Sequence, residues 1–339
     1  MMMDANDRPA TDSCHLGARP GGTDPVSPVI HSEGGTIPGE DGPAFVLQRA
    51  NPAPIPVILA VPHAGRSYPA GVLAAMRQPA QAARRLEDRL VDLVAQAVAR
   101  HTGAALLVAR APRAMIDLNR APDDLDREMI VPDPAMADFP PLPRGPMAAR
   151  RAHSGLGLVP RRLVGLGEIW RQRTPAAEIQ ARIAQIHLPY HQALADALAD
   201  LAARWGAALL IDLHSMPPLP RRDSAEAPPT YVLGDRFGAA CAGGVMATAF
   251  AHLASCGARA AHNRPYAGGY GLERQARREA GIHAMQVEID RSAYLDAALA
   301  EPGEGLADVV ETMTGMVRAL AADVAAMGQA AQRWPRAAE

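Results

Sequence analysis

The chain contains no lysine, so all 34 of its basic residues are arginine. A lysine Schiff base, a P-loop lysine and a kinase-type lysine are therefore excluded as catalytic groups. The three cysteines, Cys14, Cys241 and Cys256, are widely spaced and form no CxxC pair. The sequence thus predicts neither a disulfide framework nor a thiolate zinc site, and it fits a reducing compartment.

The chain also has a small net charge and lacks long apolar runs. The formal net charge is −2 and the sequence pI is about 6.6, so no overall field favours nucleic acid or an anionic membrane. No run approaches the ~18 apolar residues that a membrane span needs, and the polar N-terminus has no signal-peptide core. We expect a cytoplasmic protein with no nucleic-acid or membrane partner. The oligomeric state stays open.

What the chain does have is apolar content for a large core, with 48% hydrophobic residues among 339. Residues 1–42 are rich in Gly, Pro, Asp and Ser and show almost no apolar periodicity, which predicts a disordered lead-in. We expect residues 43–330 to form a single domain and residues 331–339 a flexible tail.

Strand-length apolar runs alternate with helical patterns over this domain. The pattern predicts strands at 56–61, 104–109, 114–117, 207–214, 230–234 and 285–290, and helices at 81–101, 175–204 (kinked or divided at Pro189), 237–254 and 305–326. A long Pro- and Gly-rich loop at 121–170 is of the kind that covers active sites. This alternation indicates an α/β fold of three layers, α/β/α, around a mostly parallel or mixed central sheet.

Two histidines follow two predicted strands in the same way, His63 in VPHAGRSYP and His214 in DLHSMP. Ligands gather beyond the carboxyl ends of strands in such sheets, so both imidazoles are expected there. A single such histidine is more often structural, but a matched pair favours a zinc site, which needs three protein ligands and one open position for catalysis. Asp212, two residues before His214, faces the same side and is expected to orient its ring.

Carboxylates complete the set of candidates. Glu87 and Asp88 are the nearest to His63 in sequence as a third ligand; the alternative is a solvated helix face paired with neighbouring arginines. MQVEIDRSAY places Glu288 in an otherwise apolar strand, where a carboxylate needs either a function or a partner such as Arg291.

A further pair, Asn119 and Arg120 in IDLNR, offers donors that can hold a substrate carboxylate, unless it is a simple surface turn.

Taken together, these motifs resemble the N-formylglutamate amidohydrolase family from about residue 55 to 295. The resemblance rests on VPHAGRSYP, LEDRLVD, DLNR, GLGLVPRR, HLPYH, DLHSMP, GDRFG, NRPYAGGYG and QVEIDRSAY. The family is similar to zinc carboxypeptidases and aspartoacylase, which share a three-layer fold. The resemblance implies a bacterial, cytoplasmic zinc amidohydrolase of histidine catabolism, which cleaves N-formyl-L-glutamate or a similar N-acyl amino acid to the free amino acid and formate or another carboxylate.

The resemblance also implies roles for single residues. His63 and His214 match the histidine ligands of Zn²⁺, and the carboxylate ligand falls at Asp88, with Glu87 as the alternative. The carboxypeptidase pattern differs, because its glutamate ligand lies three residues after the first histidine, where this chain has Arg66. The remaining matches are Glu288 as general base and Asn119 and Arg120 as the carboxylate clamp. Apart from these matches, NRPYAGGYG predicts a flexible, glycine-rich loop that lines the pocket, with Asn263, Arg264 and Tyr266 as substrate contacts; the alternative is a simple surface turn.

Some patterns compete with this interpretation. HLPYH resembles a zincin helix, but Leu188 stands where the glutamate would be, so His187 and His191 are expected to pack or to rim the site. The arginines of 144–162 are expected to lie in a solvated loop rather than to bind RNA. Two other functions remain open: a related deacylase or carboxypeptidase-type hydrolase with another acyl-amino-acid substrate, and a non-catalytic ligand-binding homologue.

Overall fold

The structure, a computed structural model, describes residues 28–136, 139, 152, 154–221 and 227–333. In this part of the chain, eight strands form one mixed sheet in the order β1-β2-β4-β3-β9-β12-β10-β11. The strands are β1 Val29–Gly34, β2 Phe45–Ala50, β3 Val57–Val61, β4 Ala105–Ala109, β9 Ala208–Met216, β10 Tyr231–Gly234, β11 Ala260–His262 and β12 Ile282–Asp290. The central strands β4, β3, β9 and β12 run parallel, whereas β1, β2 and β10 are added through antiparallel pairings.

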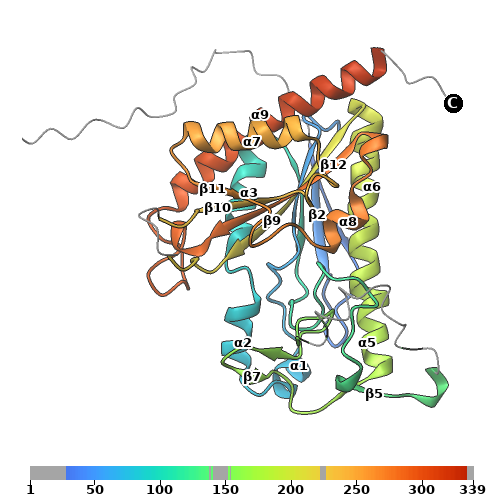
Figure 1. Ribbon diagram of the computed structural model, residues 1–339. Coiled ribbons are helices and arrows are strands. Elements are labelled where there is room, and N and C mark those ends of the chain that lie inside the picture. Colours follow the sequence, from blue (N-terminus) through green and yellow to red (C-terminus); the bar gives the residue numbers. More distant parts are fainter. Residues whose placement is uncertain (1–27, 137–138, 140–151, 153, 222–226, 334–339) are drawn as a thin grey trace, which may run out of the picture.

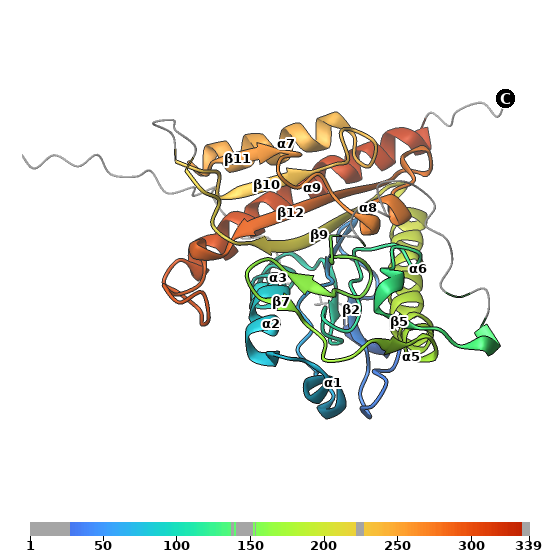
Figure 2. The same ribbon diagram turned by 60° about the horizontal axis from the view of Figure 1, so that its bottom comes forward.

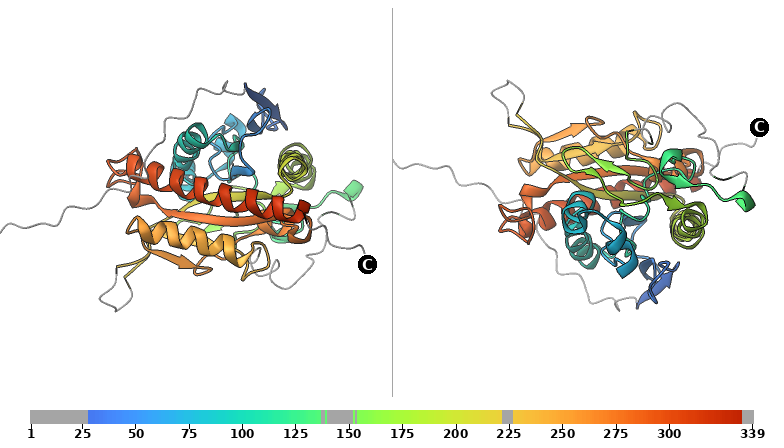
Figure 3. Two further views of the ribbon diagram at one scale, coloured as in Figure 1. Left: turned by 90° about the horizontal axis from the view of Figure 1, so that it is seen from above. Right: turned by 90° about the horizontal axis from the view of Figure 1, so that it is seen from below.

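Helices cover both faces of this sheet (Figure 1). One layer contains α3 Val91–Thr102, α7 Gly243–Ser255 and α9 Leu306–Arg333, with α9 between the other two (Figure 3). The other contains α6 Leu188–Trp205 and α8 Tyr270–Gln275. Alternate residues of β9 serve the two layers, since Leu209 and Ile211 join the core under α9 and Leu210 joins the core under α6. The predicted three-layer α/β fold is therefore confirmed.

Smaller elements lie together below the sheet in Figure 1 and come forward in Figure 2. They are α1 Ala70–Ala75, α2 Pro79–Leu86, the hairpin of β6 Arg162–Leu163 and β7 Gly167–Glu168, the pair of β5 Ile130–Val131 and β8 Thr174–Pro175, and α5 Ala176–Arg182. Short 3₁₀ turns occupy 127–129, 134–136, 278–280 and 291–293.

The predicted helix over 81–101 is wrong, because the structure has two helices there. α2 ends at Leu86, and α3 begins at Val91 after Leu90, which adopts a left-handed φ of 56°. In the break, the backbone N–H of Asp88 donates to the carbonyl of His63 at 3.0 Å. The apolar pattern runs through both helices, but this contact with the loop after β3 interrupts the helix.

Three further predictions need correction. The lead-in was expected to extend to residue 42, yet Val29–Gly34 forms β1 and pairs with β2, while residues 1–27 lie outside the described residues. The stretch 114–117 is a buried turn rather than a strand, in which Met115 and Ile116 both donate their N–H groups to Pro112 O. At the other end, 331–333 belong to α9, and 334–339 are outside the described residues.

The predicted helical segment over 175–204 is confirmed, and so is the prediction that it is divided near Pro189. α5 passes into a π-helical segment, Ile183–His187, directly before α6, and Pro189 stands in the first turn of α6, where its missing N–H costs least. In the described part of the basic stretch, Arg161 binds the carboxylates of Asp126, Glu128 and Glu168 at 2.8–3.1 Å. No helix within the described ranges has both the length and the apolar character to cross a bilayer.

Candidate functional site

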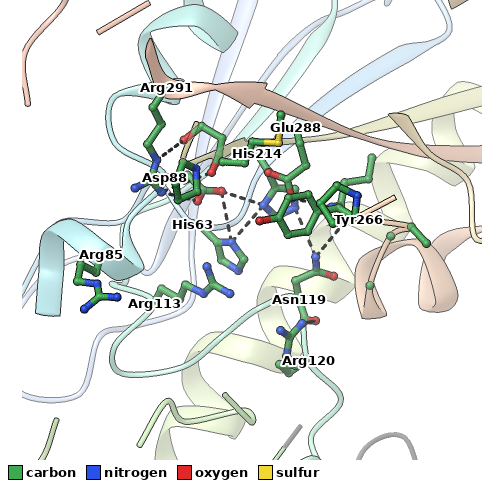
Figure 4. Close-up of a pocket in the computed structure, with 18 residues that line it drawn as sticks. His63, Arg85, Asp88, Arg113, Asn119, Arg120, His214, Tyr266, Glu288 and Arg291 are labelled. Carbon is green, nitrogen blue, oxygen red and sulfur yellow. Dashed lines mark hydrogen bonds and ion pairs between the residues drawn. The ribbon is translucent and has the colours of Figure 1, made fainter. Parts of the chain in front are cut away.

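Three side chains converge beyond the carboxyl ends of the parallel strands. His63 follows β3, His214 lies near the end of β9, and Asp88 occupies the break between α2 and α3. The Nδ1 atoms of the two histidines are 3.1 Å apart. Asp88 Oδ2 lies 2.9 Å from Nδ1 of His214 and 3.4 Å from Nδ1 of His63. All three side chains are buried. The break in the predicted helix therefore brings Asp88 to the two imidazoles (Figure 4).

Buried partners fix these three groups. The Nε2–H of His63 donates to Asp117 Oδ1 at 2.7 Å, and Nε2 of His214 lies 3.1 Å from Asp212 Oδ2. Both rings thereby direct Nδ1 at Asp88, as metal-binding histidines backed by carboxylates do. Asp212 thus lies beside the ring of His214, as the sequence predicts. The corresponding partner of His63, Asp117, was missed although it lies in IDLNR.

Asp88 has a partner on its other oxygen. Arg291 Nη2 lies 3.3 Å from Asp88 Oδ1 and donates to the carbonyl of Glu87, while its Nε donates to Ser215 Oγ at 3.1 Å. Burial alone would raise the pKa of Asp88, but hydrogen bonds from His214 and His63 hold this pKa below its usual range. The side chain of Glu87, the alternative ligand, lies 3.7 Å from Arg89 and is not part of the group.

The donor set fits a zinc ion. Nitrogen and oxygen ligands about 2.0–2.1 Å from Zn²⁺ in tetrahedral geometry lie roughly 3.3 Å from one another, close to the three separations found here. Two imidazoles whose Nε2 atoms face carboxylates direct two Nδ1 lone pairs at each other, and a cation between them removes that repulsion. Three protein ligands also leave a tetrahedral position for a water or a substrate.

The carboxylate of Glu288, on β12, lies in the same pocket. Glu288 is paired with His214 in the register of β12 and β9, so the two residues are neighbours on adjacent strands. Gln286, two residues earlier on the same face, donates Nε2–H to Glu288 Oε1 at 2.8 Å. Burial raises the pKa of Glu288 to about 7. A carboxyl group poised near neutrality can both accept and return a proton.

Asn119 and Arg120 form another wall of the pocket. Asn119 Oδ1 accepts from the N–H of Gly271 at 3.0 Å, and a Cβ on Gly269 would lie only 2.3 Å from that oxygen. The glycine-rich loop thus approaches Asn119 as closely as it does because it has no side chain there. Arg120 donates Nε–H to Leu156 O at 3.0 Å and Nη1–H to Asn119 O at 2.8 Å.

The histidines of HLPYH support this wall from behind. Both are fully buried, and their Nε2–H groups donate to the carbonyls of Arg120 and Leu118, each at 2.9 Å. Their rings are tilted against each other, with 4.5 Å between centroids. The prediction that His187 and His191 pack beside the site is confirmed.

Of the three predicted residues in the glycine-rich loop, Tyr266 lines the pocket, whereas Asn263 and Arg264 do not. Asn263 is buried; its Oδ1 accepts from the N–H of Asp235 at 3.0 Å and its Nδ2 donates to Asp235 Oδ1 at 2.8 Å. The structure therefore gives Asn263 a role in holding this loop against the GDRFG turn, at a left-handed φ of 58°.

Sequence reasoning missed Arg113, which also lines the pocket. Its Nε and Nη2 lie 3.0 and 2.9 Å from Asp117 Oδ2, so Asp117 bridges this guanidinium and His63. Arg113 belongs to none of the motifs and follows β4 by only a few residues, so no pattern in the sequence marks it.

The pocket encloses about 210 Å³. Because a single water needs only about 10–15 Å³ of such space, the pocket has room for a ligand of amino-acid size. A cation site, a buried carboxylate and several arginines around such a space can activate water and stabilise an oxyanion, as hydrolysis of an amide requires.

Comparisons with known proteins agree with this chemistry. The family model of N-formylglutamate amidohydrolase matches residues 55–295. A curated relative, the N-formylglutamate deformylase of Pseudomonas aeruginosa, is 28% identical over 282 residues, 81% of this chain and 94% of that protein. The crystal structure of N-formylglutamate amidohydrolase from Ralstonia eutropha JMP134 gives a TM-score of 0.71 at 28% identity, covering 86% of this chain and 99% of that one. A gene product of Agrobacterium tumefaciens shares the fold, with a TM-score of 0.58 at 17% identity over 83% of this chain and 96% of that one.

Proposed function

From the premise that this chain belongs to the N-formylglutamate amidohydrolase family and is an amidohydrolase, we propose that it hydrolyses N-formyl-L-glutamate or a close N-acyl relative. The products are the free amino acid and formate or the corresponding carboxylate. The observation that carries the proposal is the convergence of His63, Asp88 and His214 with Glu288 in one amino-acid-sized pocket. Residues 43–330, extended by β1, act as one catalytic domain.

The metal ligands in this proposal are Nδ1 of His63, Nδ1 of His214 and Oδ2 of Asp88. A zinc ion held there would polarise the amide carbonyl and lower the pKa of water in the site. Asp117 and Asp212, each beside an Nε2 atom, would orient the two rings with Nδ1 towards the ion.

Glu288 is the general base and then the general acid. It accepts a proton as water adds to the carbonyl carbon, and it returns that proton to the amide nitrogen as the C–N bond breaks, so that formate and the amine of the amino acid leave. Gln286 supports this role because its amide N–H fixes the orientation of the carboxyl group through Oε1.

The polar walls hold the rest of the substrate. Arg113, anchored by Asp117, faces the oxyanion that forms on the carbonyl oxygen. Asn119 and Arg120 bind the α-carboxylate of the amino-acid portion. Tyr266, half-buried on the glycine-rich loop, closes one side over the reacting amide.

The test is a panel of N-formyl and N-acetyl amino acids offered to zinc-loaded protein, with release of free amine measured. We expect cleavage of N-formylglutamate or a near relative. Zinc bound without cleavage of any N-formyl substrate would favour a deacylase of different acyl preference. Protein that takes up no metal and cleaves nothing would indicate a ligand-binding homologue and would contradict the proposal.

A further inference from the structure

Four arginines line the pocket, and three of them have protein partners. Arg291 is held by Ser215 and the Glu87–Asp88 segment, and Arg113 is held by Asp117. Arg120 donates to two backbone carbonyls. Their guanidinium groups are thereby fixed in position around the reaction centre.

Arg85 is the fourth, and it differs. It stands in the last turn of α2, is solvent-exposed, and has no hydrogen bond or ion pair anywhere in the described part of the chain. Its neighbour across the pocket mouth is the tip of the β6–β7 hairpin, since a Cβ on Gly165 would lie 3.8 Å from Arg85 Nη1. Both Figure 1 and Figure 2 show that hairpin beside α2. The guanidinium of Arg85 thus lines the pocket, and its N–H donors bind no other described group.

Position separates Arg85 from the carboxylate clamp. Figure 4 shows Arg85 well apart from Arg120, with Arg113 between the two in this view. In the proposed binding mode, the single carboxylate of a neutral N-acyl amino acid uses the clamp of Asn119 and Arg120. A substrate with a second carboxylate on its side chain carries a further negative charge. The three arginines that already bind protein groups have fewer free N–H donors to offer this second carboxylate.

We propose that Arg85 is the specificity-determining residue that binds the side-chain carboxylate of an acidic N-acyl amino acid. This inference rests on the proposed function and deepens it, because it gives a reason for preferring formylglutamate to a neutral formyl amino acid. The fork of guanidinium donors suits a carboxylate, and an exposed arginine at the mouth reaches it without desolvating a buried charge.

The experiment compares N-formylglutamate with its neutral isostere N-formylglutamine, using zinc-loaded wild type, Arg85→Ala and Arg85→Lys. Arg84→Ala is the matched control, since Arg84 is the preceding residue of the same turn, is exposed and does not line the pocket. For Arg85→Ala we expect kcat/KM on formylglutamate to fall on the order of 10- to 100-fold, mainly through KM, because a charge-assisted hydrogen bond is lost. Formylglutamine should change less than about threefold, and Arg85→Lys should recover part of the loss.

The outcomes separate the inference from the function on which it rests. Wild type that cleaves formylglutamate with a preference unchanged in Arg85→Ala would overturn the role of Arg85 alone. An equal fall on both substrates would assign Arg85 to the structure of α2 and would also overturn it. Wild type that cleaves neither substrate would overturn the proposed function, and this inference with it.

Discussion

Nε2 of His63 lies 2.7 Å from Oδ1 of Asp117, and both side chains are buried. The same carboxylate accepts the backbone N–H of Asn119 at 2.9 Å through Oδ1 and binds Arg113 through Oδ2. Burial alone would raise the pKa of Asp117, but the positive charge of Arg113 and the hydrogen bond from His63 hold it well below its usual range. One ionised side chain therefore connects three groups to which we propose functions: the metal ligand His63, the oxyanion-binding Arg113 and the substrate-binding Asn119.

This connection predicts the effect of Asp117→Asn. The amide is uncharged and makes Nδ1 of His63 a weaker donor, so zinc affinity should fall about 10- to 100-fold. Competition of the apoprotein and a chromophoric chelator for zinc measures the change directly. Asp200→Asn, at an exposed position that pairs only with Arg49 in the described structure, serves as the control. Unchanged zinc affinity in a folded Asp117→Asn protein would contradict the role given to Asp117.

Replacing the proposed base separates chemistry from metal binding. In Glu288→Gln the side chain keeps its volume but cannot accept a proton, so kcat should fall about 10²- to 10⁴-fold. Zinc content should stay at the wild-type level, because Glu288 is outside the donor group of His63, Asp88 and His214. Steady-state kinetics and metal analysis on the same sample check both statements. Glu311→Gln, on the exposed face of α9, is the control, and near-normal turnover of Glu288→Gln would remove the assigned base.

The sequence predicted the parts of this site that regular strands position. Parallel strands bring their carboxyl ends to one edge, so His63 after β3, His214 in β9 and Glu288 in β12 could be expected to meet. Their identity as strands was visible in short apolar runs that are buried on both faces.

The parts that depend on loops were not predictable in the same way. The apolar periodicity continues across Glu87 to Leu90, so the sequence does not show that tertiary hydrogen bonds separate α2 from α3. These bonds run from Asp88 N–H to the carbonyl of His63 and from Arg291 to the carbonyl of Glu87. Asp117 and Arg113 gain their roles from a buried turn whose apolar residues resemble a strand. Asn263 looked like a substrate contact because it stands in the glycine-rich loop, yet its hydrogen-bonding groups are used by Asp235.

The glycine-rich loop itself gives a prediction about substrate affinity. A Cβ at position 269 would lie 2.3 Å from Oδ1 and 2.8 Å from Nδ2 of Asn119, so Gly269→Ala must displace that amide. We expect kcat/KM to fall on the order of 10- to 100-fold, since misplacing a binding group by about 1 Å has that effect. Gly71→Ala in α1, where a Cβ meets nothing within 4 Å, should leave the kinetics unchanged. Wild-type kinetics in Gly269→Ala would mean that Asn119 does not hold substrate.

The buried histidines behind the clamp predict how stability depends on pH. Burial lowers the pKa of His187 to about 4 and that of His191 well below its ordinary value near 6.5. The unfolded chain then binds more protons than the folded chain below about pH 6.5, so folding free energy is lost as the pH falls from there towards about 4. Each such histidine contributes about 1.4 kcal/mol per pH unit within that window.

Urea unfolding at a series of pH values between about 7 and 4.5 measures this dependence. In His187→Gln with His191→Gln, the amides can still donate to the carbonyls of Arg120 and Leu118 but do not titrate, so the fall in stability with decreasing pH should be shallower than in wild type. Comparing slopes removes the contribution of the other titrating groups, which both proteins share. The exposed His101→Gln is the matched control. Equal slopes in wild type and the double variant would show that these two rings do not stay neutral in the folded protein.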